Sequence, residues 1–451
     1  MKTIYVACGA GFGGDRFDAS GPLIEHLSEC DGPRYLIFET LAERTLAIAQ
    51  NQMLRGEGPG YSEFLERYLE PVLKPCRKAN IKIISNLGAA NVAGAGARMR
   101  EVAGALGLDG YKIAIVEGDD LLQVASEEMI AQMEPVEGTS IERPLVGANV
   151  YLGARPIAQA LELGADLVLT GRCTDAALTL GPVVREFDVK RDQMGLLAAG
   201  TLAGHLLECG PQVTGAYFAD PPYKPVPDLA NVGYPVGEIS ENGDVVITKP
   251  LGTGGLVSEA TVKEQILYEM HDPANYLTPD VTLDVSQVSV RQEGPDRVRV
   301  TGAEGKRPPA TLKATVSMDA GYLAEAEMSY AGPNARARAE LAIDILRQRF
   351  QRLAISCAVR FDIIGTQSVF DDDRGRLRAG DVSDLNGEFR VRVAARSTDK
   401  EELERMTTEV YSLWVTGPAG GAGFRKHLSS KVKTASVLVD PGLPDVTVRL
   451  V

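Results

Sequence analysis

The sequence has few cysteines and histidines, and neither kind is grouped. The six cysteines among its 451 residues are scattered without a C-x-x-C pair, so they indicate neither a zinc site nor a disulfide framework. The four histidines lie in different segments, which argues against a histidine-rich metal site. This cysteine usage predicts a reduced, cytoplasmic protein.

The sequence also lacks a long apolar run and an excess of basic residues. No apolar stretch is long enough to span a bilayer, and the N-terminus runs straight into a strand without a signal-peptide pattern. The net charge of -14, with a pI near 5.0, argues against binding to nucleic acid or to an anionic membrane. We therefore expect a small-molecule partner, and an anionic substrate would need arginines and lysines gathered locally.

The order of apolar runs and helical segments predicts an α/β protein of two domains. Residues 1–215 are expected to form a doubly wound domain with a mostly parallel sheet, because each connection is long enough for a right-handed crossover. Residues 216–223 are expected to form a strand and a rigid exit, which marks the boundary. Residues 216–451 are expected to form an α+β domain, in which the β-α-β-β-α-β order after about residue 324 is that of a split βαβ (ferredoxin-like) sandwich.

The stretch 167–175 carries the clearest functional signal. A short apolar run over 167–170 predicts a strand buried on both faces, and Arg172 and Asp175 follow it at once. The carboxyl end of such a strand is the edge where open α/β sheets bind ligands. The alternative is a helix cap with Arg172 on the surface.

Polar side chains also follow the second and third predicted strands. Glu39 and Glu43 are four residues apart and share a face if the helix already includes Glu39, where they either do acid–base work or simply favour the helix dipole. Asn86 and Asn91 are suited to hydrogen bonding with a carbonyl or carboxylate, and they are also good turn and cap residues. Glu39 and Glu43 join Asp175 as the candidate catalytic residues.

Two further segments offer ligand groups. Glu117, Asp119 and Asp120 follow the fourth strand, where three acids within four residues either hold a divalent metal or form a solvated loop and helix cap. The glycine loop after the strand near residue 248 places Lys249 and glycine N–H groups where they would cradle an anion, or it is a plain strand–turn–helix joint. The residues expected to bind substrate there are Lys249, Gly252 and Gly254.

The first strand leads into a glycine pattern that resembles a dinucleotide fingerprint. Gly9, Gly11 and Gly14 have the G-x-G-x-x-G spacing. Asp15 follows the third glycine, however, where an acid would repel the pyrophosphate, so we do not expect NAD. Asp15 and Arg16 are instead expected to contact the substrate at the rim formed by the strand ends.

Several motifs, taken together, resemble those of the acyclic terpene utilisation AtuA family from about residue 3 to 440. They include CGAGFGGD, FETLAERT, NLGAAN, VEGDD, GRCTD, AGHLLECG, ITKPLGTGG, SYAGP and TGPAGGAG. The resemblance implies a bacterial catabolic setting, the breakdown of citronellol- and geraniol-type compounds through acyl-CoA intermediates. Longer relatives add a small C-terminal ferredoxin-like module that this sequence does not contain, so a small partner subunit is a further expectation.

These observations together predict an oligomeric catabolic enzyme, a lyase that hydrates or dehydrates a small carboxylate or acyl-CoA thioester. In this hypothesis Arg172, with Arg16 or Lys249, binds the anion, and Glu39 or Asp175 moves the proton. Asn86 and Asn91 would stabilise a carbonyl oxygen or its enolate. The alternatives are a partner-dependent subunit of a heteromeric enzyme and an NAD(P)-dependent dehydrogenase.

Overall fold

The computed structural model describes residues 1–136, 138–365 and 387–451. The chain divides into two compact units. The first comprises residues 1–318 together with 434–451, and the second comprises residues 319–433. Among the described residues, no helix combines the length and apolar character needed to cross a bilayer.

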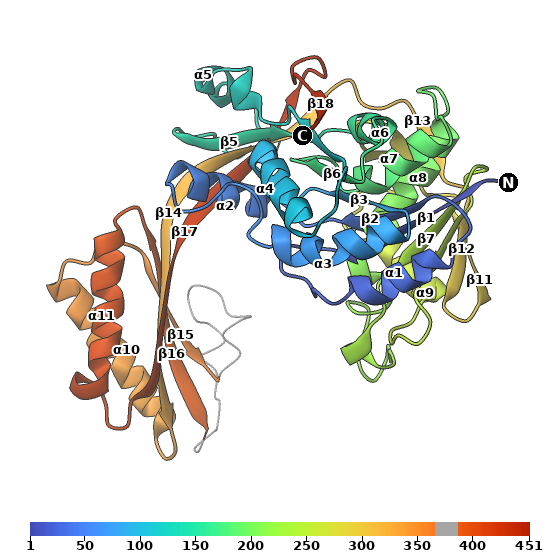
Figure 1. Ribbon diagram of the computed structural model, residues 1–451. Coiled ribbons are helices and arrows are strands. Elements are labelled where there is room, and N and C mark those ends of the chain that lie inside the picture. The colour runs from blue at the N-terminus through green and yellow to red at the C-terminus, as the bar shows by residue number, and fades with distance from the viewer. Residues whose placement is uncertain (137, 366–386) are drawn as a thin grey trace. The chain divides into compact units, whose positions relative to one another are not determined.

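The first unit is built on a ten-stranded mixed sheet whose centre is parallel (Figure 1). Its short apolar strands are almost wholly buried, as expected for strands covered on both faces. The parallel strands follow one another in the sheet in the order β1 (Thr3–Ala10), β2 (Arg34–Phe38), β3 (Ile81–Ser85), β6 (Leu167–Thr170) and β4 (Ile113–Glu117).

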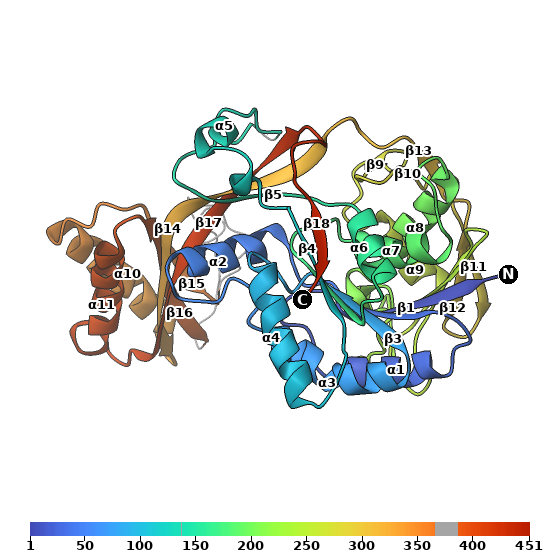
Figure 2. The ribbon, with the colours of Figure 1, turned by 45° about the horizontal axis from the view of Figure 1, so that its top comes forward.

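Helices cover both faces of this parallel region (Figures 1 and 2). Because side chains alternate along a strand, Leu36 and Phe38 pack into one core and Tyr35 and Ile37 into another. The first core includes α1 (Ser20–Ser28), α3 (Leu65–Lys78) and α4 (Val92–Ala105). The second includes α6 (Arg155–Glu162), α7 (Ala177–Glu186) and α8 (Met194–Leu207).

Antiparallel strands extend the sheet on both sides. On one side β7 pairs with β1 and is followed in the sheet by β8, β12 and β11, and on the other side β18 pairs with β4. The boundary predicted after residue 215 therefore falls inside the first unit, because β7 continues the same sheet. These strands are β7 (Val236–Ser240), β8 (Val245–Thr248), β11 (Ser289–Gly294), β12 (Arg297–Thr301) and β18 (Thr447–Leu450).

Smaller elements complete the first unit. Strand β5 pairs with the first part of the long strand β14, and β13, β10 and β9 form a separate sheet. The strands are β5 (Leu145–Val150), β9 (Tyr276–Leu277), β10 (Thr282–Asp284), β13 (Glu304–Lys306) and β14 (Leu312–Ala331). The helices are α2 (Glu43–Leu54), α5 (Glu127–Ala131) and α9 (Glu259–Leu267).

The second unit has its own sheet and core. Its strands lie in the order β15-β16-β14-β17, and one face packs against two helices around Met328, Val391, Leu346 and Met406. The strands β14 and β17 begin or end beyond this unit, at residues 312 and 439. After β14 the elements are α10 (Ala335–Arg352), β15 (Val359–Ile364), β16 (Glu388–Ser397), α11 (Lys400–Thr416) and β17 (Ala422–Val439).

The architecture confirms the prediction of an α/β chain, and its ten-stranded sheet is mixed. The doubly wound and split βαβ arrangements stay predictions. The prediction of a strand within residues 216–223 is wrong, because this segment forms turns, with a single bridge between Asp220 and Lys224. Pro221 and Pro222 lack the N–H groups that a strand ladder needs.

Two prolines lie inside α3 and do not end it. Helix α3 runs through Pro71 and Pro75, and its apolar stripe, which includes Tyr68 and Leu73, is buried against the sheet. Burial of this stripe outweighs the loss of backbone hydrogen bonds at the prolines.

Candidate active site

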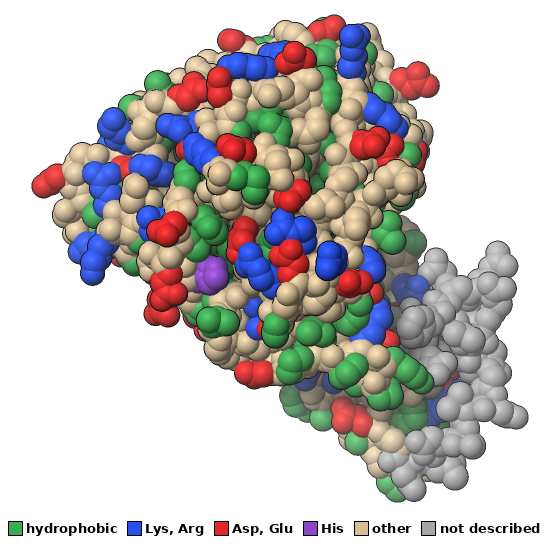
Figure 3. All heavy atoms as spheres, turned by 90° about the vertical axis from the view of Figure 1, so that its right-hand side faces the viewer, with side chains coloured by type: hydrophobic (Ala, Val, Ile, Leu, Met, Phe, Trp, Pro, Cys, Tyr) green, Lys and Arg blue, Asp and Glu red, His purple; other side chains and the backbone are tan. Residues whose placement is uncertain are grey.

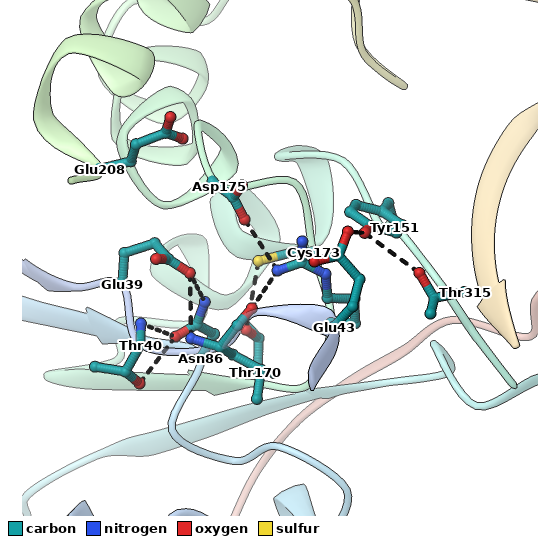
Figure 4. A network of polar contacts seen from close by, with 12 residues as sticks. Glu39, Thr40, Glu43, Asn86, Tyr151, Thr170, Cys173, Asp175, Glu208 and Thr315 are labelled. Carbon is teal, nitrogen blue, oxygen red and sulfur yellow. Dashed lines mark hydrogen bonds and ion pairs between the residues drawn. The ribbon is translucent and has the colours of Figure 1, made fainter. Parts of the chain in front are cut away.

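Three of the predicted residues lie together at the carboxyl ends of neighbouring strands (Figure 4). Glu39, Asn86 and Arg172 follow β2, β3 and β6, which are adjacent in the sheet. All three are buried, with exposed fractions of 8%, 0% and 2%. A parallel sheet brings these strand ends to one edge, which is why residues up to 133 positions apart in the chain meet here.

Among the described residues, hydrogen bonds hold Glu39 by one of its two carboxyl oxygens. Its Oε1 accepts from Asn86 Nδ2 at 2.7 Å and from the backbone N–H of Leu41 at 3.3 Å. Burial and the nearby charge of Asp175 raise the pKa of Glu39 to about 8, although Arg172 and Asn86 act in the opposite direction. This environment therefore favours the protonated form of Glu39.

Arg172 provides the positive charge at the centre of the group. Its Nη1 donates to the carbonyl oxygen of Leu41 and, at 2.9 Å, to Asp175 Oδ1. Its guanidinium stacks over the ring of Tyr151, 4.1 Å from the ring centroid. Among the described residues, its buried Nε has no hydrogen-bond partner. Arg172 is therefore a buried cation whose N–H groups are not all used in hydrogen bonds to the described residues.

Glu43 has the opposite electrostatic setting from Glu39. Its Oε1 accepts hydrogen bonds from Tyr151 and, at 3.4 Å, from Lys313 Nζ. Burial raises its pKa, but the charge of Arg172 and the Tyr151 hydrogen bond outweigh this and bring the pKa to about 2. The pKa values of two glutamates four residues apart are therefore shifted in opposite directions, a pattern typical of acid–base sites.

Two further carboxyl groups complete the cluster. The Asp175 side chain is 35% exposed, which makes it accessible from solvent. Glu208 follows α8 and is 5% exposed. Figure 4 shows Glu39, Asp175 and Glu208 close to one another, and their charges interact. We call Glu39, Asp175 and Glu208 with the Arg172 guanidinium the carboxyl cluster.

Asp119 supports the carboxyl cluster by binding the backbone at Arg172. Its Oδ2 accepts from the backbone N–H of Arg172 at 2.9 Å and from Asn149 Nδ2 at 2.8 Å. Asn149 in turn accepts from Gln50 Nε2 at 2.6 Å. Burial raises the pKa of Asp119 to about 6, although these hydrogen bonds oppose the effect. Asp119 thus fixes the backbone that carries Arg172.

The other two acids predicted to bind metal do not join Asp119. Glu117 pairs with Arg449 at 3.0 Å, and Asp120 caps a short helical turn by accepting from the N–H of Leu122 at 3.0 Å. In the described part of the chain, no group of three histidine, cysteine, aspartate or glutamate side chains is placed to hold a metal ion. The three predicted ligands therefore have separate structural partners.

Asp15 and Arg16 are engaged in the loop after β1. The Asp15 carboxylate accepts from the N–H of Gly11 at 2.9 Å and from the hydroxyl of Tyr234, and Arg16 donates to the carbonyl of Ala230 at 3.0 Å. Helix α1 begins only at Ser20. A dinucleotide fingerprint places a helix directly after the glycines, so this loop does not have that geometry.

Asn91 and the glycine loop after β8 have local structural roles as well. Asn91 caps α4 by accepting from the N–H of Gly94 at 2.9 Å. Lys249 is buried, donates to the Thr253 carbonyl at 2.9 Å and pairs with Asp296 at 3.1 Å.

Neither glycine of this loop contacts the cluster. Gly252 adopts a φ of +75°, and a Cβ at Gly254 would collide with the carbonyl oxygen of Asp228. Both positions thus require glycine for the backbone. A shallow surface hollow is lined by Lys224, Lys263 and Tyr268 among others, and none of its residues belongs to the carboxyl cluster.

Tyr151 and Glu208 were not identified from the sequence. Tyr151 follows β5, which pairs with a strand more than 160 residues later in the chain, so no local pattern places it at the sheet edge. Glu208 lies within the motif AGHLLECG. The available signal in this motif was a histidine and a glutamate three residues apart, and the structure shows that both are buried.

The structure thus defines an α/β protein with a buried acid–base cluster at the carboxyl edge of its parallel strands. The sequence matches the family model for the acyclic terpene utilisation family protein AtuA over residues 4–449, and the chain belongs to this family. No curated protein sequence matches it.

One solved structure shows a weak likeness. A de novo designed protein, Ferredog-Diesel, is similar over 24% of this chain and 85% of its own, with 17% sequence identity and a TM-score of 0.16. A likeness at this score supports no statement about this chain.

Proposed function

We propose that the protein is a cytoplasmic, homo-oligomeric catabolic enzyme of the lyase type. Its substrate would be a small carboxylate or acyl-CoA thioester from the breakdown of acyclic terpenes or branched acids, and its reaction hydration, dehydration or a related proton transfer. Family membership supports the metabolic setting. The carboxyl cluster supports the chemistry.

The observation that carries the proposal is the buried Glu39 carboxyl beside Arg172 and Asp175, where burial and Asp175 raise its pKa. Because Glu39 Oε1 already accepts two hydrogen bonds, Oε2 is the oxygen that carries the proton. Glu39 would act as the general acid, and the exposed Asp175 carboxylate would accept a proton from substrate or water. Arg172 would stabilise negative charge that develops between them.

The contacts refine the roles expected for the polar residues. Arg172 Nη1 is bound to Asp175 and to the Leu41 carbonyl, so Arg172 would meet a substrate oxygen through its other N–H groups. Asn86 donates to Glu39 and accepts from the N–H of Thr40 at 2.9 Å, so it orients the acid instead of binding substrate. Glu43 stays ionised and balances the charge of Arg172 through Tyr151.

Solvent exchange tests this function. Purified protein is incubated in deuterated water with a panel of acyl-CoA thioesters and small carboxylates, and deuterium incorporation is followed by mass spectrometry. We expect the wild type to label one substrate class and Glu39→Gln to be slower by about 100-fold or more, since a positioned acid contributes on that order. Glu101→Gln, on the exposed side of α4, is the matched control and should behave as wild type.

Unchanged labelling in Glu39→Gln would contradict the acid role. Labelling of no compound by the wild type would favour the alternative of a subunit that needs a partner polypeptide. Co-purification from the native host would then identify that partner.

A further inference from the structure

A buried ion pair lies at the end of α8, and the proposed mechanism does not use it. The pair consists of His205 and Glu208, whose side chains are 1% and 6% exposed. Helix α9 packs against α8, and the ring of Tyr276 in β9 lies 5.4 Å from the His205 ring. Two ionisable groups removed from water in this way cost free energy unless they neutralise each other.

The burial and closeness of the two side chains favour one proton held by the pair. His205 Nε2 lies 3.2 Å from the carbonyl oxygen of Ile266, and a carbonyl only accepts, so Nε2 carries a hydrogen. The other ring nitrogen, Nδ1, lies 3.2 Å from Glu208 Oε1. Neither Nδ1 nor Glu208 Oε2 has a hydrogen-bond partner among the described residues. Without a proton on the pair, a buried carboxylate would face an uncharged ring and stay unneutralised. The pair is therefore either His⁺ with a carboxylate or neutral His with a carboxylic acid.

The surroundings of Glu208 are mainly acidic. The groups that face it come from several elements: His205 on its own helix, Asp175 before α7, Glu39 after β2, Glu269 after α9, Cys209, and Tyr276 in β9. Burial and the charges of Asp175 and Glu269 raise the pKa of Glu208, although His205 lowers it. Burial lowers the pKa of His205, but Glu208 raises it by more, so the net shift of the pKa is upward. Glu208 Oε2 has no hydrogen-bond partner among the described residues.

We propose that His205 and Glu208 are positioning residues that share one proton and thereby control the protonation of Glu39. With the proton on His205, the negative charge of Glu208 faces Glu39 and keeps the Glu39 carboxyl protonated. With the proton on Glu208, this charge is absent and Glu39 releases its proton more readily. This inference rests on the proposed acid role of Glu39.

Carboxyl NMR on the intact protein without substrate tests the coupling. Glutamate labelled with ¹³C at the side-chain carboxyl is incorporated, the Glu39 signal is assigned from its loss in Glu39→Gln, and its titration is followed. In Glu208→Gln we expect the Glu39 midpoint to fall by about one pH unit, the size typical of removing one nearby like charge. Glu208→Asp keeps the charge and should restore most of the wild-type midpoint.

His205→Asn is the second variant. Without its partner, the buried Glu208 takes up a proton and loses its charge, so the Glu39 midpoint should fall here too. Glu101→Gln removes an exposed charge and should leave the midpoint unchanged. A Glu39 midpoint that is the same in Glu208→Gln and wild type, with both folded, would overturn the proposal. If Glu208→Gln does not fold, an unchanged midpoint in His205→Asn would overturn it.

This test separates the inference from the proposed function. A shifted midpoint together with full deuterium labelling by Glu39→Gln would keep the coupling and refute the acid role. An unshifted midpoint together with loss of labelling in Glu39→Gln would refute the coupling and keep the acid role.

Discussion

At the scale of single residues, Glu39 and Glu43 show how environment sets acid strength. The carboxyl of Glu39 is buried beside Asp175, whereas that of Glu43 accepts hydrogen bonds from Tyr151 and Lys313. The sequence showed that the two share a helical spacing. It could not give their different pKa values, because the groups that cause them come from distant segments.

The raised pKa of Glu39 predicts a particular dependence of stability on pH. The folded protein binds this proton more tightly than the unfolded chain does, so the contribution is fully present below about pH 4.5 and is lost as the pH rises through about 8. Urea unfolding of the wild type and Glu39→Gln between pH 5 and 9 measures the difference, in which the other titrating groups largely cancel. The wild type should lose more free energy of unfolding than the variant as the pH rises. Parallel plots of this free energy against pH for the two proteins would contradict the raised pKa of Glu39.

Several candidate residues have structural partners for a related reason. Asn91, Asp120 and Asp15 were predicted from their positions after strands, and each accepts a backbone N–H close to it in sequence. Caps and turns use the same short polar side chains as binding sites do. Residue type and spacing alone therefore do not separate the two uses.

At the scale of elements, the edge of the sheet was more predictable than the order of its strands. Each parallel strand ends at the same edge, which is enough to bring Glu39, Asn86 and Arg172 near one another. The insertion of β6 between β3 and β4, and the pairing of β5 with β14, depend on contacts far apart in sequence. For that reason Tyr151 was missed.

The turn after β6 depends on a glycine. A Cβ at Gly171 would collide with Asp119 Oδ1, the carboxylate that also accepts the Arg172 N–H. We expect Gly171→Ala to lower the free energy of unfolding by about 1–3 kcal/mol, as overpacking does, and to slow any turnover. Chemical denaturation measures the first effect.

Gly104→Ala is the matched control for this turn. A Cβ at Gly104, within α4, meets nothing within 4 Å, and alanine favours a helix by about 1 kcal/mol. This variant should be as stable as the wild type or more so. Equal behaviour of the two alanine variants would show that the turn tolerates a side chain.

At the scale of the whole molecule, neither the charged side chains nor the core residues are gathered in one place. Figure 3 shows acidic and basic side chains interspersed on the face that it presents, without a continuous basic field for a polyanion. The core of the second unit draws its residues from 324–413, and the two main cores of the first unit draw none from that range. The domain division predicted from the order of segments along the chain missed this, because the second unit interrupts the first in sequence.

Separate cores predict separate local stability. Leu403 of α11 is fully buried in the second unit, so Leu403→Ala should destabilise that unit by about 2–5 kcal/mol. Hydrogen exchange followed by mass spectrometry should show faster exchange in α10, β16 and α11, with β2 and β6 unchanged. Leu202→Ala in α8 is the counterpart in the first unit and should give the reverse pattern. Faster exchange throughout the chain in both variants would show a single cooperative unit instead.

The most direct test of the account is the titration of the Glu39 carboxyl in the wild-type protein. The ¹³C signal of this group, assigned with Glu39→Gln, reports whether it holds a proton. We expect a carboxylic acid at pH 7 and a midpoint near 8, because burial and Asp175 disfavour the charged form. A midpoint near the ordinary value of about 4.5 would mean that Glu39 is ionised at neutral pH, and it would contradict its assignment as the acid of this site.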